Sequence, residues 1–305
     1  MKSIWRVIIF ASVIAIAAGC KDKEANEGTE TVLTGRATIA VDESILPIMQ
    51  DQVQIFEDAY KGKIILSANS GSQVVNALLS DSVQIAVLSR NLNEKELEVF
   101  KNRKISPKVT NFAIDAITLI AHKSSTDTII ALNDVLRFLK GEKIVGFDGI
   151  VFDNLNSSIA RQLLEMANVT AESAKNVFSF KTNEEVIKYV AENKGMIGVV
   201  GINWILQPSD NMQNYIDNVH ILSVKGLKSD QYISPTQNNL AEGTYPLARD
   251  LFMINAQGKA GLGMGFASFI AGERGQRIIL KSGLLPTRMP GRNLILRKTI
   301  NVEKK

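Results

Sequence analysis

Two serine-rich loops in this chain of 305 residues could each bind an anion. The first, Asn69–Ser72, and the second, Asn154–Ser158, both follow an apolar run and precede an amphipathic segment. A helix that begins in such a loop presents free backbone N–H groups and the positive end of its dipole, and the hydroxyls add donors. The alternative is that these serines are ordinary helix N-caps, which need no ligand. Two such loops on separate lobes favour a cleft that closes on an anion.

Three further residues could complete this site. Arg90 follows the apolar run 85–88 and would supply positive charge. Asp115 lies in an apolar stretch, where it could orient Arg90 or accept a proton from a ligand; the alternative is an aspartate at a strand edge that faces water. Ser44 would donate from the loop that follows the predicted strand 37–41. The expected ligand-binding residues are Ser44, Ser70, Gly71, Ser72, Arg90, Asp115, Ser157 and Ser158.

The elements that must position these residues alternate between strands and helices. Apolar runs predict strands over residues 37–41, 63–67, 84–88, 196–200 and 245–254. Helical periodicity and end signals predict helices over residues 45–60, 133–140, 183–193, 262–271 and 273–281. A long extended segment over 109–121 suits a crossover between two lobes. This alternation predicts a largely parallel α/β sheet with helices on both faces, and such sheets bind ligands beyond the carboxyl ends of their strands.

The composition excludes several classes of function. The chain is 45% hydrophobic and 22% charged, which is typical of a globular protein long enough for two lobes. Its net charge of +4 falls to +2 without Lys2 and Arg6, so we expect no nucleic-acid partner. Cys20 is the single cysteine, which excludes an intrachain disulfide. His122 and His220 are not spaced as metal ligands, so we expect neither a metal nor another cofactor.

The N-terminus has the pattern of a secreted and lipidated protein. Residues 1–19 hold a charged start, an apolar run too short for a comfortable membrane span, and small residues before Cys20. This pattern resembles the bacterial lipobox, which implies a signal peptide over 1–19 and a lipid anchor on Cys20. Residues 20–35 are polar and predict a flexible tether. The charged residues after Cys20 resemble the export signals of some Bacteroidetes lipoproteins.

Six short motifs, in the same order along the chain, resemble the substrate-binding proteins of ABC-type phosphate importers, a family of type II periplasmic binding proteins. They extend from about Thr38 to Pro286. The motifs are the Asn69–Ser72 loop, Leu88-Ser89-Arg90-Asn91-Leu92, the Phe112–Ala121 strand, Met196-Ile197-Gly198-Val199-Val200-Gly201, Tyr245-Pro246-Leu247-Ala248-Arg249, and Gly275-Gln276 with Gly283-Leu284-Leu285-Pro286.

The resemblance implies a two-lobed fold in which each lobe is a mostly parallel sheet flanked by helices, with the ligand cleft between the lobes. We expect residues 36–115 and 236–305 to form lobe 1 and residues 116–235 to form lobe 2. It also implies a monomer in the cell envelope, facing the periplasm or cell surface, that captures phosphate or a related oxyanion and presents it to an ABC-type permease. No cofactor is implied, because hinge closure needs none.

Two departures from the family pattern leave other functions open. No arginine stands directly before the serines of the second serine-rich loop, Ile159 stands where the family has threonine, and Arg161 lies further along. The loop that follows the predicted strand 37–41 carries Asp42 and Glu43, whose charges repel an anion. A different ligand, or a protein-interaction role on the same fold, is therefore the alternative.

A nucleotide-binding or enzymatic role has less support. The glycines of 261–265 lack the spacing of a dinucleotide site. For a hydrolase, Asp153 with Asp115 or Glu43 could form an acid pair, but any polar cleft offers such pairs, and the chain has no Gly-x-Ser-x-Gly elbow. We therefore expect a binding protein that is not an enzyme.

Overall fold

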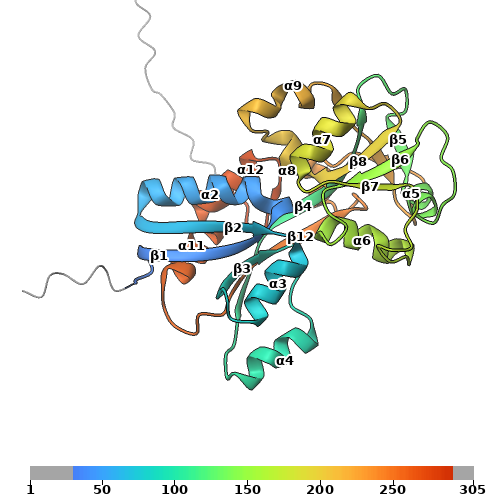
Figure 1. Ribbon diagram of the computed structural model, residues 1–305. Coiled ribbons are helices and arrows are strands. Elements are labelled where there is room, and N and C mark those ends of the chain that lie inside the picture. The colour runs from blue at the N-terminus through green and yellow to red at the C-terminus, as the bar shows by residue number, and fades with distance from the viewer. Residues whose placement is uncertain (1–29, 291–305) are drawn as a thin grey trace, which may run out of the picture.

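The computed structural model describes residues 30–290, in which two groups of strands and helices share one long central sheet (Figure 1). The strands are β1 (Thr34–Asp42), β2 (Lys61–Asn69), β3 (Ile85–Leu88), β4 (Lys108–His122), β5 (Ile129–Ala131), β6 (Gly149–Phe152), β7 (Val177–Ser179), β8 (Met196–Gly201), β9 (Val219–Ile221), β10 (Ser223–Lys225), β11 (Tyr232–Ile233), β12 (Ala248–Asn255) and β13 (Leu285–Pro286).

The helices flank this sheet. They are the 3-10 turns η1 (Glu43–Ile45) and η2 (Asp210–Met212), and α2 (Leu46–Ala59), α3 (Gly71–Leu79), α4 (Glu94–Asn102), α5 (Leu132–Leu139), α6 (Ser158–Ala167), α7 (Asn183–Glu192), α8 (Ile202–Leu206), α9 (Gln213–Ile216), α10 (Gln237–Ala241), α11 (Leu262–Ala271) and α12 (Glu273–Lys281). The predicted helices over 262–271 and 273–281 are confirmed with the same bounds.

The sheet has the strand order β2-β1-β3-β12-β4-β8-β6-β7, with β9 and β13 also paired to β4. The outer ladders of β1 with β2 and β3, and of β6 with β7 and β8, are parallel, as predicted. The ladders of β4 and β12 in the middle are antiparallel, so the sheet as a whole is mixed. β5, β10 and β11 form a separate small sheet.

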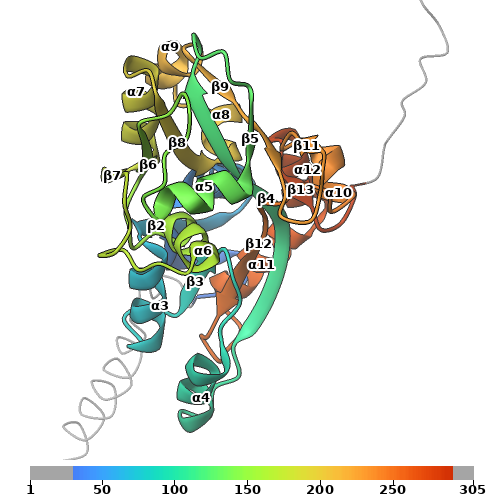
Figure 2. The ribbon, with the colours of Figure 1, turned by 90° about the vertical axis from the view of Figure 1, so that its right-hand side faces the viewer.

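One strand joins the two lobes. Residues 108–116 of β4 pair with β12, and residues 117–122 pair with β8 and β9 (Figure 2). We call the part with β1–β3, β12, α2–α4, α11 and α12 the first lobe, and the part with β6–β8 and α5–α9 the second lobe. The extended segment predicted over 109–121 is therefore a single strand that belongs to both lobes.

The core follows the apolar faces of these elements. The largest buried cluster extends through both lobes, from Ile39 of β1 and Phe56 of α2 to Val199 of β8. Two smaller clusters lie beneath α3 and α4 in the first lobe and beneath α7 and α8 in the second. The helices α5 and α6 show the expected i, i+3, i+4 spacing of buried residues. The carboxyl ends of β1, β2 and β6 lead into η1, the first serine-rich loop and the second serine-rich loop, respectively.

The predicted signal peptide over 1–19, the predicted lipid anchor on Cys20 and most of the predicted tether lie outside the described residues. The stretch predicted as a tether, 20–35, ends in regular structure, because β1 begins at Thr34. Before it, the Glu30 carboxylate accepts hydrogen bonds from Gln257 Nε2 at 3.1 Å and from the backbone N–H of Leu262 at 3.0 Å. Among residues 30–290, no helix is both long and apolar enough to cross a bilayer.

Candidate functional site

A buried ion pair lies where the two lobes meet. Arg249 of β12 and Asp115 of β4 are register partners, and their side chains are 2% and 1% exposed. Arg249 Nε and Nη2 both donate to Asp115 Oδ2, at 2.9 Å and 2.7 Å. The two hydrogen bonds fix the guanidinium plane, so the remaining N–H groups point in set directions.

Those N–H groups meet one serine from each lobe. Arg249 Nη2 donates to Ser44 Oγ of η1 at 3.1 Å, and Nη1 donates to Ser158 Oγ of α6 at 3.1 Å. The two hydroxyls are 3.3 Å apart, and all three side chains are buried. The Ser158 hydroxyl can also donate its own proton, whereas the Ser44 hydroxyl donates to Asp42 Oδ1 at 2.9 Å and must turn to donate to a ligand. This is a donor set suited to a tetrahedral oxyanion.

Asp42 lies beside this group at the end of β1. Its Oδ1 accepts hydrogen bonds from Ser44, from Oγ at 2.9 Å and from the backbone N–H at 3.2 Å. Its Oδ2 is buried and accepts no hydrogen bond from any residue that the structure describes. The site therefore contains two carboxylates, Asp42 and Asp115, beside a single arginine.

The two lobes come close together at the first serine-rich loop. Ser70 is the N-cap of α3 and forms a capping box with Gln73. A Cβ on Gly71 would lie 3.0 Å from Asp42 Oδ2 and 3.3 Å from Ser158 Cβ, so only glycine fits there without displacement. Ser72 Oγ donates across to the backbone carbonyl of the second lobe at Asn156, at 3.3 Å.

In the second loop, the two serines have different roles. Ser157 is the N-cap of α6, and its Oγ accepts a hydrogen bond from Ala160 N at 3.1 Å. Ser157 therefore acts as an ordinary helix N-cap, which is the alternative to a ligand-binding role for this serine. Ser158, the first residue of α6, is the one that reaches Arg249. Arg161, one turn along, lies 3.5 Å from Ser72 Oγ through Nη1, so it contacts the facing lobe away from Arg249.

Arg90 does not pair with Asp115, and the prediction that Asp115 orients Arg90 is wrong. Arg90 instead makes a double hydrogen bond to Glu96 of α4, at 2.8 Å and 2.7 Å, and a third to Asn91 O. Its side chain is 33% exposed. The physical reason is local, because Glu96 is the N3 residue of the Asn93 capping box and stands directly after the Arg90 turn. Whether Arg90 contributes to ligand binding stays a prediction.

The cation of this group is therefore Arg249. It is the last residue of the Tyr245-Pro246-Leu247-Ala248-Arg249 motif, but it is not among the ligand-binding residues expected from the sequence. A signal was present in β12, where Arg249 alternates in phase with Leu251 and Met253. All three face inward, while Asp250 between them is exposed. A charged residue on the apolar phase of a strand is costly to bury unless it is paired, so the pattern indicated an arginine with a buried partner.

A second contact between the lobes is made by carboxylates. Glu43 of η1 accepts hydrogen bonds from the backbone N–H of Asn183 at 3.2 Å and from its Nδ2, at the start of α7. Asn183 Nδ2 also donates to Asp153 Oδ2 at 3.2 Å. Burial, together with the nearby charge of Asp153, raises the pKa of Glu43 to about 8. Burial likewise raises the pKa of Asp153.

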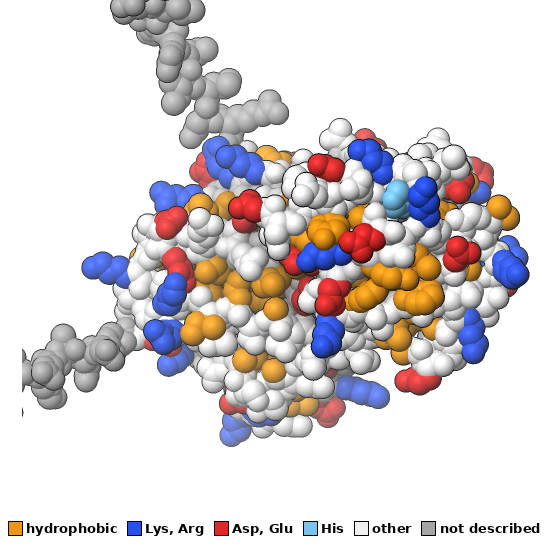
Figure 3. All heavy atoms as spheres, turned by 45° about the horizontal axis from the view of Figure 1, so that its top comes forward, with side chains coloured by type: hydrophobic (Ala, Val, Ile, Leu, Met, Phe, Trp, Pro, Cys, Tyr) orange, Lys and Arg blue, Asp and Glu red, His pale blue; other side chains and the backbone are white. Residues whose placement is uncertain are grey.

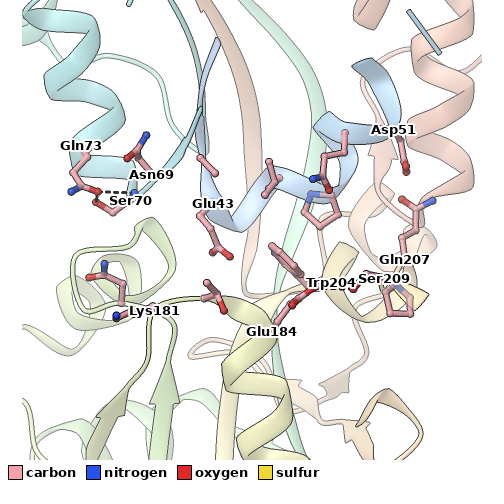
Figure 4. A pocket seen from close by; sticks show the side chains of 17 residues that line it. Glu43, Asp51, Asn69, Ser70, Gln73, Lys181, Glu184, Trp204, Gln207 and Ser209 are labelled. Carbon is pink, nitrogen blue, oxygen red and sulfur yellow. Dashed lines mark hydrogen bonds between the residues drawn. The ribbon is translucent and has the colours of Figure 1, made fainter. Parts of the chain in front are cut away.

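A cavity of about 670 Å³ opens next to these contacts (Figure 4). Its walls come from both lobes, with Asp51 and Ser70 on the first and Lys181, Glu184 and Trp204 on the second. The indole Nε1 of Trp204 donates to the backbone carbonyl of Ser44 at 3.2 Å, which ties the second lobe to the loop that carries the site.

Other chemistry finds little support in the described part of the chain. Residues 30–290 contain no group of three or more His, Cys, Asp or Glu side chains placed to hold a metal ion. On the face shown in Figure 3, Lys and Arg side chains are interspersed with Asp and Glu and form no continuous basic surface.

Comparisons with known proteins agree with this arrangement. The chain is 25% identical over 297 residues to "Phosphate-binding protein PstS" of Borreliella burgdorferi, covering 92% of this chain and 97% of that protein. A putative phosphate ABC transporter substrate-binding protein with bound phosphate, from Clostridium perfringens, has a TM-score of 0.68 at 19% identity, over 83% of this chain and 100% of that one. An ABC-type phosphate transport receptor from Vibrio cholerae has a TM-score of 0.61 at 15% identity, over 83% and 100% of the two chains.

These two solved structures share the two-lobed α/β architecture, so the predicted fold class is confirmed. The family described as "PBP superfamily domain" matches residues 26–274, most of the chain. The chain therefore belongs to the PBP superfamily domain family, and within it resembles the PstS phosphate-binding proteins.

Proposed function

We propose that this protein is the extracytoplasmic solute-binding component of an ABC-type importer, and that it binds inorganic phosphate or a related oxyanion between its two lobes. The observation that carries the proposal is the group formed by Arg249, Ser44 and Ser158. It joins a fixed guanidinium to one hydroxyl from each lobe. The proposal is also supported by relatives of this chain that are named as phosphate-binding proteins. The solved structures of this fold include one with bound phosphate.

The mechanism follows from this geometry. The ion pair with Asp115 holds Arg249 in place before a ligand arrives, so ordering the guanidinium adds no further entropic cost on binding. An oxyanion at this point would accept the O–H of Ser158 from the second lobe and an N–H of Arg249 from the first, and the Ser44 O–H if it turns away from Asp42 Oδ1. Because both lobes must contribute, binding favours the closed arrangement of the lobes.

Calorimetry on the purified protein with phosphate, arsenate, sulfate and molybdate tests this function. We expect phosphate to bind at micromolar strength or better, and Ser158→Ala to weaken it by about tenfold, since a hydrogen bond to a charged group is worth about 1.5–3 kcal/mol. Arg249→Ala should abolish binding. Arg90→Ala tests the prediction that Arg90 also binds the ligand, although its side chain is 33% exposed and is paired with Glu96.

Two outcomes would contradict the proposal. A well-folded protein that binds none of the four oxyanions would favour the alternative ligand or a protein-interaction role. Loss of binding in Arg90→Ala with retention in Ser158→Ala would move the site to the Arg90 turn.

We propose further that the chain divides into lobe 1 (36–115 and 236–305) and lobe 2 (116–235), acts as a monomer without enzymatic activity, and delivers its ligand to a membrane permease. The polar start after residue 19 and the lipobox-like sequence support a lipid anchor on Cys20 in the cell envelope. Cys20→Ala should move the protein to the soluble fraction of the producing cell. Retention of that variant in the membrane fraction would contradict lipidation.

A further inference from the structure

The side chain of Asn203 is buried in the second lobe without a hydrogen-bond partner. The residue belongs to α8, which directly follows β8, and it is 1% exposed. Neither its amide nitrogen nor its amide oxygen forms a hydrogen bond with any residue between 30 and 290. Buried amide groups are nearly always hydrogen-bonded, because an unpaired one is costly. This amide therefore adds no hydrogen bond to the fold and is available to another molecule.

The glycine two residues earlier leaves a space in front of this amide. Gly201 has φ of −70° and ψ of 143°, a conformation that any residue adopts. A Cβ at Gly201 would nonetheless lie 2.8 Å from Asn203 Oδ1, 3.0 Å from the backbone oxygen of Ser44 and 3.4 Å from Arg249 Nη2. Glycine provides room at this position and not backbone freedom. The amide of Asn203 and the guanidinium of Arg249 thus border the same small space.

The groups that border this space suit an oxygen atom with negative charge. Arg249 Nη2 lies on one side, where it also donates to Ser44 Oγ at 3.1 Å. The Asn203 amide has two N–H donors without an acceptor, and a half-turn of the amide plane lets the nitrogen take the place of the oxygen. The backbone oxygen of Ser44 already accepts a hydrogen bond from Trp204 Nε1 at 3.2 Å. An anion oxygen would give the free N–H donors an acceptor beside a cation.

The second lobe has few other donors to offer at this point. Ser158 reaches Arg249, but the hydroxyl of Ser157 is used as the N-cap of α6. Arg161 contacts Ser72 of the first lobe, away from Arg249. The cation of the site thus comes from the first lobe, and the second lobe can add neutral donors to it.

We propose that Asn203 is a ligand-binding residue of the second lobe, and that its amide donates to the oxygen of a bound oxyanion that lies beside Arg249 Nη2. This inference rests on the proposed function and deepens it. Together with Ser158, Asn203 gives the second lobe two uncharged donors to the ligand. Both hydrogen bonds require the second lobe to lie against Arg249, so they add to the preference of the bound protein for the closed arrangement.

Calorimetry with phosphate, combined with thermal melting of the ligand-free protein, tests the proposal. Asn203→Leu keeps the approximate shape of the side chain and removes both polar atoms. We expect it to bind phosphate about tenfold more weakly or worse, because a hydrogen bond to a charged group is lost. Its ligand-free melting temperature should equal or exceed that of wild type, since no hydrogen bond within the protein is lost. Asn203→Asp, which places a carboxylate beside the anion, should weaken binding by about a hundredfold.

Matched variants separate this role from general effects on the lobe. Asn214→Leu and Asn214→Asp make the same two changes at an exposed asparagine of α9 and should bind phosphate as wild type does. Gly201→Ala fills the space and should weaken binding by about tenfold. Adding Asn203→Leu to Gly201→Ala should cause little further loss, because both changes remove the same interaction.

The results have distinct meanings. Wild-type affinity in Asn203→Leu overturns the proposal and leaves a buried water molecule as the partner of the amide. Weaker binding by Asn203→Leu together with a lower ligand-free melting temperature also overturns it, because the amide would then support the fold. Weaker binding at an unchanged or higher melting temperature supports it. A folded wild-type protein that binds none of phosphate, arsenate, sulfate and molybdate refutes the proposed function, and this inference with it.

Discussion

The contact of Glu43 with Asn183 predicts that the folded protein loses stability as the pH rises toward 8. Glu43 comes from the first lobe and its carboxylate lies at the start of α7 in the second, close to Asp153. Burial and the charge of Asp153 raise its pKa from 4.5 to about 8. Between these two pH values the folded protein holds a proton that the unfolded chain has released. Unfolding therefore becomes easier with increasing pH over this window.

The size of the effect follows from the pKa difference. At about 1.4 kcal/mol per pH unit, the full difference corresponds to a ceiling of about 5 kcal/mol. Glu43 shares its proton affinity with Asp153, and Asn183 stabilises the ionised form through two hydrogen bonds. We therefore expect about 2 kcal/mol between pH 5 and pH 8, which is about 4–8 °C in melting temperature for a chain of this length.

The assay compares Glu43→Gln with wild type by thermal melting and urea unfolding from pH 5 to pH 8. Glutamine resembles the protonated side chain at every pH, so the variant should match wild type at pH 5 and exceed its stability at pH 8. Glu184→Gln is the matched control, since Glu184 lies on the cavity wall and contacts Ser209 rather than Asn183. A wild-type stability that increases across this window, or a variant that is destabilised equally at every pH, would refute the reasoning.

Two glycines carry further predictions. Gly71→Ala should weaken oxyanion binding by tenfold or more in calorimetry while changing the melting temperature little, because the new Cβ would lie 3.3 Å from Ser158 Cβ of the second lobe and hold the lobes apart; unchanged affinity would show that this approach is not needed. Gly265→Ala should lower the free energy of unfolding by about 1–3 kcal/mol without changing affinity in the folded protein, because its Cβ would stand 1.6 Å from the backbone carbonyl oxygen of Val32. A wild-type melting curve for Gly265→Ala would contradict it.

Most of the fold could be predicted because local patterns decide it. The helices α11 and α12 have clear apolar periodicity and glycine boundaries, and their predicted bounds are those of the structure. The long strand β4 was visible as an apolar run of unusual length. The antiparallel ladders in the middle of the sheet were not predicted, since strand direction depends on how β12 returns from the second lobe, which no local pattern encodes.

The site was predicted less well, because pairing between distant residues decides it. The sequence indicated two serine-rich helix starts, and Ser158 and Gly71 do lie at the junction of the lobes. It could not show which arginine lies there. Arg90 follows the first serine-rich loop after α3 and β3 but is paired with Glu96, whereas Arg249 reaches Asp115 only through the register of β12 with β4, over a separation of 134 residues.

The continuous strand β4 also has a consequence for motion. Asp115 lies within two residues of the point where β4 changes partners, from β12 to β8. Points close to the axis of a hinge travel least when the lobes rotate, while loops far from it travel most. The Asp115–Arg249 pair would then keep its place and its desolvation throughout an opening and closing cycle, and the serine of the second lobe would swing toward it. The positive charge of the site would therefore stay in place, and the site residue that moves toward it would carry a neutral hydroxyl group.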